Sequence, residues 1–234
     1  MAAEKLSQKH SIPYHIHLSE TRKEVFDCLQ AHKKRPAYYL DSLGVLSSRT
    51  LAAHCVWLTK EEVRLLASKG VSSSLCVESN MKLSSGGTAP LPEMQECGMN
   101  ISLGTDGAAS NNSLSMFSAM KFTGLLVKNA RWDATAAKEA GILSAAAAGG
   151  AQALGLDAGE LKEGKLADII LLDKKAPNLV PAHSNIANIV YSAHAGNVTD
   201  TIINGEIVMR DRKLLTVDEE KIIGAAQEQA ESLI

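Results

Sequence analysis

The chain has 234 residues, of which 45% are hydrophobic and 21% are charged, so it can bury a core and is neither collagen-like nor disordered. Its 24 basic and 26 acidic side chains leave a net charge of -2, which excludes the basic field that nucleic-acid or anionic-membrane partners require. No apolar run reaches the roughly 20 residues of a membrane-spanning helix. We therefore expect a small-molecule ligand, with no nucleic acid and no membrane as partner.

The N-terminal segment and the cysteines indicate the compartment. Residues 1–15 are charged and lack the apolar stretch of a secretory signal, so a cytoplasmic location is expected. The four cysteines lie far apart and form no C-x-x-C pair, which argues against a zinc ribbon or a redox motif. We expect four reduced thiols, most of them buried.

The first half of the chain repeats one unit four times: a short run of strand-forming residues, polar residues at its end, and then a helix. Thr21 with Glu24, and Thr59 with Glu62, have the spacing of a capping box at the start of the first two helices. Strands that alternate with helices pair in parallel through right-handed crossovers, which leaves a doubly wound sheet or one half of an eightfold barrel. The expected strands are 12–17, 50–56, 71–76 and 99–105.

The pattern changes in the second half of the chain. An alanine-rich stretch, 134–156, is predicted to be helical, and a turn and a buried strand ending at Asp173 follow it. Asn204-Gly205 predicts the tight turn of a hairpin. The expected regions are a half-barrel at 1–155, a small β module at 156–215, and an amphipathic helix at 216–234 that packs on the barrel.

Polar side chains gather where the four predicted strands end. The carboxyl ends of parallel strands meet on one face of a barrel, and that face is where loops build active sites. Two imidazoles and two carboxylates at one place are typical of a metal site with general acid and base groups. The residues are His17 and Glu20 after the first strand, His54 after the second, Ser79 and Asn80 after the third, and Asp106 after the fourth.

Each of these residues also has a structural interpretation. A lone histidine such as His54 is more often a hydrogen-bonded structural residue than a catalytic one. Glu20 could stabilise the first turn of a helix, and Asp106 could be an ordinary N-cap. Their coincidence at one edge favours a site. His15 is predicted to be a hydrogen-bonded core histidine, and His194 is predicted to be structural.

Four motifs in order carry a resemblance to a known family: HIHLSET, LAAHCV, ESNMKLSSGG and SLGTDGAASNN. They resemble strands five to eight of the amidohydrolase superfamily, and more narrowly its S-adenosylhomocysteine/methylthioadenosine deaminases. The segments GELKEGKLADIILLD and INGEIVMRDRKLL resemble the same family, so the likeness covers nearly the whole chain. Several specific motifs in order are far stronger than one short match.

The resemblance implies a role for each candidate residue. His17 and Asp106 would be metal ligands, and Asp106 would also accept a proton from the attacking water. Glu20 would pass that proton to a ring nitrogen of an adenosine-like substrate, and His54 would hydrogen-bond the developing tetrahedral centre. Asn80 and Ser110 would contact the substrate, with Ser110 near its sugar. The implied cofactor is a divalent metal, with zinc favoured and iron or manganese as alternatives.

Two features depart from the family pattern. Cys76-Val77-Glu78 stands where the family usually has a proline-containing stretch, and the first-strand H-x-H metal pair is absent. The fold implied is the C-terminal half of a TIM-type (β/α)8 barrel with part of a composite β-sandwich. Such a chain would form a homo-oligomer or require the missing N-terminal half. The alternatives are a non-catalytic truncated half-barrel and an amidohydrolase that acts on another ring, such as guanine or a chlorotriazine.

Overall fold

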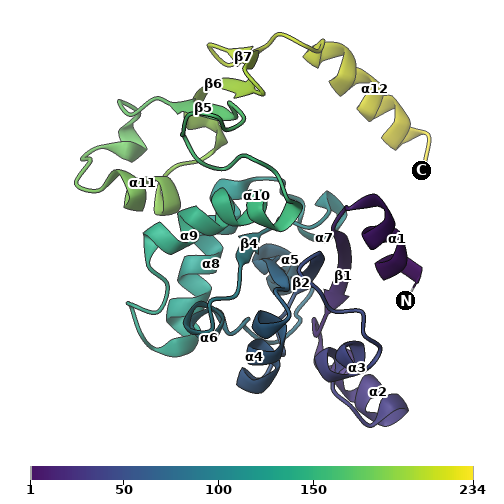
Figure 1. The fold of residues 1–234 in the computed structure, drawn as a ribbon. Helices are drawn as coiled ribbons and strands as arrows, with labels where there is room; N and C mark the ends of the chain where they lie inside the picture. Colours follow the sequence, from purple (N-terminus) through teal and green to yellow (C-terminus); the bar gives the residue numbers. More distant parts are fainter. Residues whose placement is uncertain (1, 234) are drawn as a thin grey trace.

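A four-stranded parallel sheet lies at the centre of the computed structural model, which describes residues 2–233 (Figure 1). The strand order follows the sequence, and all three pairings are parallel, as predicted. Each strand is shorter than predicted, because the residues at the ends of the predicted runs lie outside the ladder. The strands are β1 (Tyr14–Leu18), β2 (Thr50–His54), β3 (Ser72–Leu75) and β4 (Ile101–Leu103).

Helices cover one face of this sheet and form the hydrophobic core with it. Leu18, Ala52 and Leu75 project to this face and belong to one buried cluster with Val63 and Leu66. The opposite face carries His15, His17, Leu51, Ala53 and Ser74. The helices in this part of the chain are α1 (Ala2–His10), α2 (Arg22–His32), α3 (Pro36–Ser42), α4 (Lys60–Ser68), α5 (Val77–Lys82), α6 (Leu91–Glu96), α7 (Ala108–Asn111), α8 (Met116–Arg131), α9 (Glu139–Ala146) and α10 (Ala148–Leu154).

The capping predictions are confirmed at α4 and in part at α2. At α4 the Thr59 hydroxyl accepts from the Glu62 N–H, and the Glu62 carboxylate accepts from the Thr59 N–H, which completes a capping box. At α2 the Thr21 hydroxyl accepts from the Glu24 N–H, but the Glu24 carboxylate accepts from the backbone N–H groups before Thr21. Glu24 therefore holds the loop that follows β1.

One helix was not predicted, and one helix prediction needs correction. Val77–Lys82 forms α5 directly after β3, and Val77 and Asn80 of this helix turn inward and are buried. The alanine-rich stretch is two helices, α9 and α10, which are separated at Ala147 by a backbone with φ -120° and ψ -84°. Alanine favours helix everywhere in this stretch, so composition alone could not locate the break.

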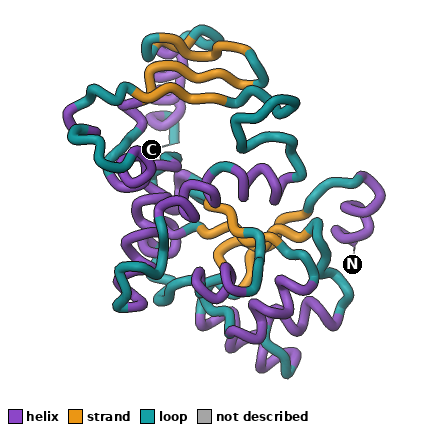
Figure 2. The backbone as a smooth tube through the Cα atoms, turned by 60° about the vertical axis from the view of Figure 1, so that its left-hand side comes forward, coloured by secondary structure: helices purple, strands orange, loops and turns teal. Residues whose placement is uncertain are grey.

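The second half of the chain forms a separate antiparallel sheet, visible as the upper group of strands in Figure 2. Asn204 and Gly205 both have positive φ values, as the predicted hairpin turn requires. The strand before Asp173 is not buried, because Ile170 and Leu171 are each about half exposed. The strands are β5 (Ile169–Leu172), β6 (Val198–Ile203), β7 (Glu206–Arg210) and β8 (Lys213–Leu214).

Two further helices lie in this half of the chain, α11 (Asn185–Tyr191), which packs against α8 and α9, and α12 (Glu219–Glu231). The predicted C-terminal helix is present as α12, but its expected packing on the barrel is not met in this structure. Every residue of α12 is exposed, and Figure 1 shows it well away from β1–β4.

His194 is structural as predicted, since its Nδ1 accepts a hydrogen bond from the Gly196 N–H. Among the described residues, 2–233, no helix is both long enough and apolar enough to cross a bilayer.

The contact between α10 and β4 yields a sharp stability prediction. A Cβ at Gly149 would overlap the carbonyl oxygen of Ile101, whereas a Cβ at the adjacent Gly150 would meet nothing within 4 Å. We expect Gly149→Ala to lower the free energy of unfolding by about 2 kcal/mol or more, because overpacking against backbone cannot relax by a rotamer change. Gly150→Ala is the matched control and should raise stability by about 0.5–1 kcal/mol, since alanine is the better helix former.

Chemical denaturation of the two variants beside the parent chain measures both effects. Equal unfolding midpoints for Gly149→Ala and Gly150→Ala would contradict the close approach of α10 to β4.

Candidate active site

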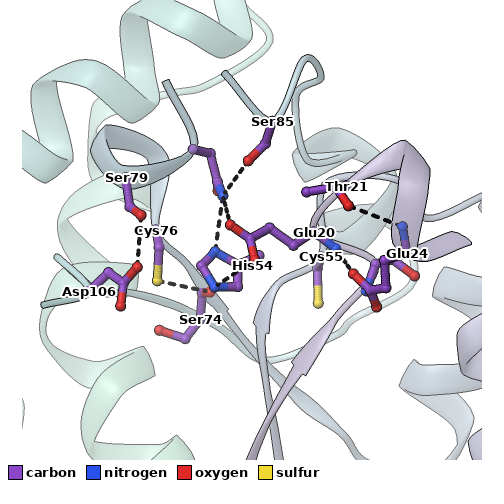
Figure 3. Close-up of polar contacts among 12 residues, drawn as sticks. Glu20, Thr21, Glu24, His54, Cys55, Ser74, Cys76, Ser79, Ser85 and Asp106 are labelled. Atoms are coloured by element: carbon purple, nitrogen blue, oxygen red, sulfur yellow. Dashed lines mark hydrogen bonds and ion pairs between the residues drawn. The ribbon is translucent and has the colours of Figure 1, made fainter. Parts of the chain in front are cut away.

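The strand ends bring Glu20, His54 and Asp106 to one edge of the parallel sheet (Figure 3). Glu20 lies two residues beyond β1, His54 is the last residue of β2, and Asp106 lies three residues beyond β4. The helix α5, which follows β3, supplies Ser79 and Asn80. Carboxyl ends of adjacent parallel strands meet at one edge, which is why residues so distant in the sequence converge.

Left-handed backbone marks the same edge. Ser19, His54, Cys55 and Asp106 all have φ values between +52° and +71°, which is uncommon for residues other than glycine. Such a conformation costs on the order of 1–3 kcal/mol per residue and clusters at functional sites. At His54 it also breaks the alternation of β2, which would otherwise direct the ring to the helix-covered face with Ala52.

His54 is almost completely buried, with 2% of its side chain exposed. Its Nε2 lies 3.8 Å from Oε2 of Glu20, and its Nδ1 lies 3.0 Å from the side-chain nitrogen of Asn80. The same Asn80 nitrogen lies 3.5 Å from Oε1 of Glu20 and 3.4 Å from Oγ of Ser85. Asn80 therefore links the imidazole and the carboxylate into one network.

Asp106 is held as an ionised carboxylate. The Ser79 hydroxyl donates to its Oδ2 over 2.7 Å, and the Gly107 N–H donates to its Oδ1 over 2.9 Å. The Ser79 hydrogen bond is the main reason that the pKa of Asp106 lies below its usual value, and Gly107 and Ser110 add to this. A carboxylate with stabilised charge suits a metal ligand or a proton acceptor.

His17 and His15 lie on the face of the sheet that helices do not cover. The ring centroids of His17 and His54 are 5.1 Å apart, so His17 joins the cluster as predicted from its place at the end of β1. Both His15 and His17 are exposed. The expectation of a hydrogen-bonded core position for His15 is therefore wrong, because β1 pairs only with β2 in the described sheet and nothing packs over this part of it.

The described residues do not form a complete metal site by themselves. Within residues 2–233, no group of three or more His, Cys, Asp or Glu side chains is placed to hold a metal ion. Ser110 lies in α7 beside Asp106 and is half-buried, whereas Asn80 is 6% exposed and faces His54. All the predicted residues thus lie near one edge of the sheet, where Asn80 is buried against His54.

Two residues support the site in a way that the sequence patterns did not indicate. Glu24 accepts hydrogen bonds from the N–H groups of Ser19 and Glu20, each over 2.6 Å, and so holds the backbone that carries Glu20. Ser79 was noted only for its position, and its hydrogen bond to Asp106 depends on the turn into α5. The spacing of Thr21 and Glu24 indicated a helix cap and contained no signal for this second function.

Comparison with known proteins supports the family resemblance. A family model described as "Amidohydrolase family" matches residues 1–208. The chain is 42% identical over 231 residues to a 5'-deoxyadenosine deaminase of Methanosphaera stadtmanae, a match that covers 99% of this chain and 54% of that protein. It is 44% identical over 230 residues to a 5-methylthioadenosine/S-adenosylhomocysteine deaminase of Pelotomaculum thermopropionicum, covering 98% and 53% respectively. The chain spans about half the length of the curated relatives it matches.

Solved structures agree with this comparison. A zinc-bound adenosine deaminase from Xanthomonas campestris superposes with a TM-score of 0.94 at 37% identity, covering 97% of this chain and 52% of that one. The atrazine chlorohydrolase TrzN from Arthrobacter aurescens superposes with a TM-score of 0.86 at 22% identity over 96% and 50%, a likeness of fold alone. Family model, relatives and fold lead to one conclusion: this chain belongs to the amidohydrolase family.

Proposed function

We propose that this chain provides the catalytic half of a metal-dependent aminohydrolase that deaminates an adenosine-like nucleoside. The observation that carries the proposal is the convergence of Glu20, His54 and Asp106 at the carboxyl edge of β1, β2 and β4. Hydrolytic deamination replaces the exocyclic amine of a purine by oxygen from water and releases ammonia. It needs a proton acceptor for the water and a proton donor for the ring, and these residues are of the right types.

Each residue has a distinct part in this proposal. Asp106, whose pKa is kept low by Ser79, accepts a proton from the attacking water. Glu20, with 24% of its side chain exposed, takes up that proton and passes it to a ring nitrogen of the substrate. His54 donates a hydrogen bond to the oxygen that attacks the ring carbon. The new hydroxyl group on the ring carbon then gives its proton, through Asp106, to the exocyclic amine. The C–N bond breaks as the C=O bond forms, ammonia leaves, and both carboxylates end in the ionised state in which they began.

The donor set fits part of a divalent metal site. His17 offers an imidazole and Asp106 a carboxylate, which are ligand types that zinc accepts, and Asp106 is ionised. A bound zinc would lower the pKa of water toward about 7. Catalytic zinc sites use about three protein ligands, so two ligands from this chain leave the set incomplete. Iron or manganese would suit the same ligand types.

We also propose that the parallel sheet is half of a closed barrel. Its four strands follow each other in sequence order, β1 pairs only with β2, and β4 pairs only with β3 within the described residues. The match to this chain covers only about half the length of each relative. A second polypeptide segment with four more strands would close the barrel and bring the remaining metal ligands.

The names of the relatives favour the substrate class. The curated relatives are called deaminases of 5'-deoxyadenosine or of methylthioadenosine and S-adenosylhomocysteine. All three compounds share an adenosine core with a modified 5' position, so the edge formed by Glu20, His54 and Asp106 would face the adenine ring. The likeness to a triazine hydrolase lies at 22% identity and does not favour that substrate.

The test is to co-express this chain with the remaining half of the Methanosphaera stadtmanae deaminase and to purify the complex. Ammonia release is then measured with 5'-deoxyadenosine, methylthioadenosine, S-adenosylhomocysteine, guanine and a chlorotriazine. We expect turnover of the adenosine compounds, and we expect Glu20→Gln to reduce kcat about 100-fold or more because the amide cannot carry the proton. Turnover of guanine alone would replace the substrate class. A stable complex without turnover of any compound would support the non-catalytic alternative.

A further inference from the structure

We infer that Asn80 sets the tautomer of His54, and that it acts as a positioning residue and does not contact the substrate. The inference rests on the proposed function only for its catalytic meaning, because the tautomer itself can be measured without turnover. Sequence reasoning had assigned Asn80 to the substrate. The structure places it 6% exposed, with its side-chain nitrogen directed at Nδ1 of the His54 ring.

The orientation of the Asn80 amide follows from its neighbours. The atom that approaches His54 also lies 3.5 Å from Oε1 of Glu20 and 3.4 Å from Oγ of Ser85. An ionised carboxylate only accepts hydrogen bonds, so an amide oxygen in this place would face another acceptor without a proton between them. The amide N–H2 group, which has two protons to donate, is therefore the group that faces all three neighbours.

A donor at 3.0 Å from Nδ1 determines which ring nitrogen of His54 carries the proton. A neutral imidazole has one N–H and one acceptor nitrogen, and the nitrogen that accepts from Asn80 cannot be the protonated one. Nε2 therefore carries the proton. It lies 3.8 Å from Oε2 of Glu20 and so faces the edge of the sheet where Glu20, His54 and Asp106 converge. His54 thus presents an N–H donor to the site.

The position of Asn80 keeps this arrangement rigid. It lies in α5, and its backbone N–H donates to the carbonyl of Cys76 while its own carbonyl accepts from the Ser85 N–H. The His54 ring is almost completely buried, so water cannot easily replace the amide as its partner. With the proton on Nε2, His54 can donate a hydrogen bond to an oxygen that becomes negatively charged during the reaction. In the other tautomer Nε2 would have no proton and could not donate this hydrogen bond.

The tautomer is measured by 15N NMR of the histidine-labelled chain at about pH 8.5, roughly two units above the ordinary pKa of an imidazole. Solid-state spectra serve equally if the chain self-associates. The chain has seven histidines, and the signal that disappears in His54→Gln identifies the residue. We expect the parent chain to show Nε2–H at His54. A parent spectrum with Nδ1–H would overturn the inference without any variant.

Asn80→Asp is the decisive variant, because it keeps the shape of the side chain and replaces the donor by an acceptor. We expect the His54 proton to move to Nδ1. Asn112→Asp is the matched control: it makes the same change beside the exposed Lys82 and should leave the His54 signals unchanged. Asn80→Leu removes donor and acceptor together and should give a mixture of tautomers. An unchanged Nε2–H signal in Asn80→Asp would overturn the inference.

Kinetics of the co-expressed complex separate positioning from substrate contact. We expect Asn80→Asp to lower kcat roughly 10-fold or more with little change in KM, as substitutions of supporting hydrogen-bond partners do. A rise in KM with kcat unchanged would return Asn80 to the substrate. If the complex has no activity at all, the proposed function fails while the measured tautomer still decides this inference.

Discussion

Substitution of Asp106 by Ala is expected to lower kcat of the completed enzyme at least 1,000-fold, on the order of what loss of a proton acceptor and metal ligand together removes. The structure gives the reason: Ser79 and Gly107 hold the Asp106 carboxylate ionised and fixed at the edge beside His54. Its side chain is half-buried and lies outside the core, so the unfolding midpoint should change little. Ammonia release and chemical denaturation measure the two quantities.

Asp133→Ala is the control for this prediction. Asp133 is an exposed acidic residue that hydrogen-bonds Thr135 in a turn, far along the chain from the carboxyl edge. Its removal should leave kcat unchanged. If Asp106→Ala retains more than about a tenth of the parent kcat, Asp106 is neither the proton acceptor nor an essential ligand.

The chain purified alone is expected to self-associate. Within the described residues β1 has a strand on one side only, and an unpaired strand edge is a template for pairing with another chain. An apolar cleft of about 650 Å3 also lies between α8, α9 and β5, lined by Phe117, Leu143 and Ile169 among others. Exposed apolar surface of this kind favours association. Light scattering should give a particle mass of at least two chains.

Addition of the remaining half of a relative is expected to reverse this association. Closure of the barrel would pair the edge of β1 and cover the face that carries His15 and His17, so particles of one chain plus one complementary half should form. A monodisperse monomer of the chain alone at high concentration would contradict the half-barrel proposal. Self-association that persists in the presence of the complementary half would contradict it as well.

Much of the parallel sheet could be predicted from sequence because its signals are local. The β-rich runs and the capping pair Thr59 and Glu62 each act within a few residues of their own position. Parallel pairing then follows from the alternation of strands and helices. The carboxyl edge was predictable for the same reason, since it needs only the end of each strand.

What could not be predicted depends on contacts between distant segments. The turn of His54 away from the face of Ala52 requires a left-handed backbone that no local pattern indicates. The network of Asn80 with His54 and Glu20 joins α5 to the ends of two strands. The exposure of His15 depends on which strands lie beside β1, and periodicity gives only the side to which it points.

Titration of this chain against a fixed amount of the complementary half, with ammonia release from 5'-deoxyadenosine as the signal, tests the central claim most directly. The claim is that one active site is shared, with Glu20, His54 and Asp106 from this chain and the missing metal ligands from the other polypeptide. It predicts no release from either part alone and a rate that rises to a plateau at one chain per complementary half. Full activity of either part alone, or no activity at any ratio, would contradict it.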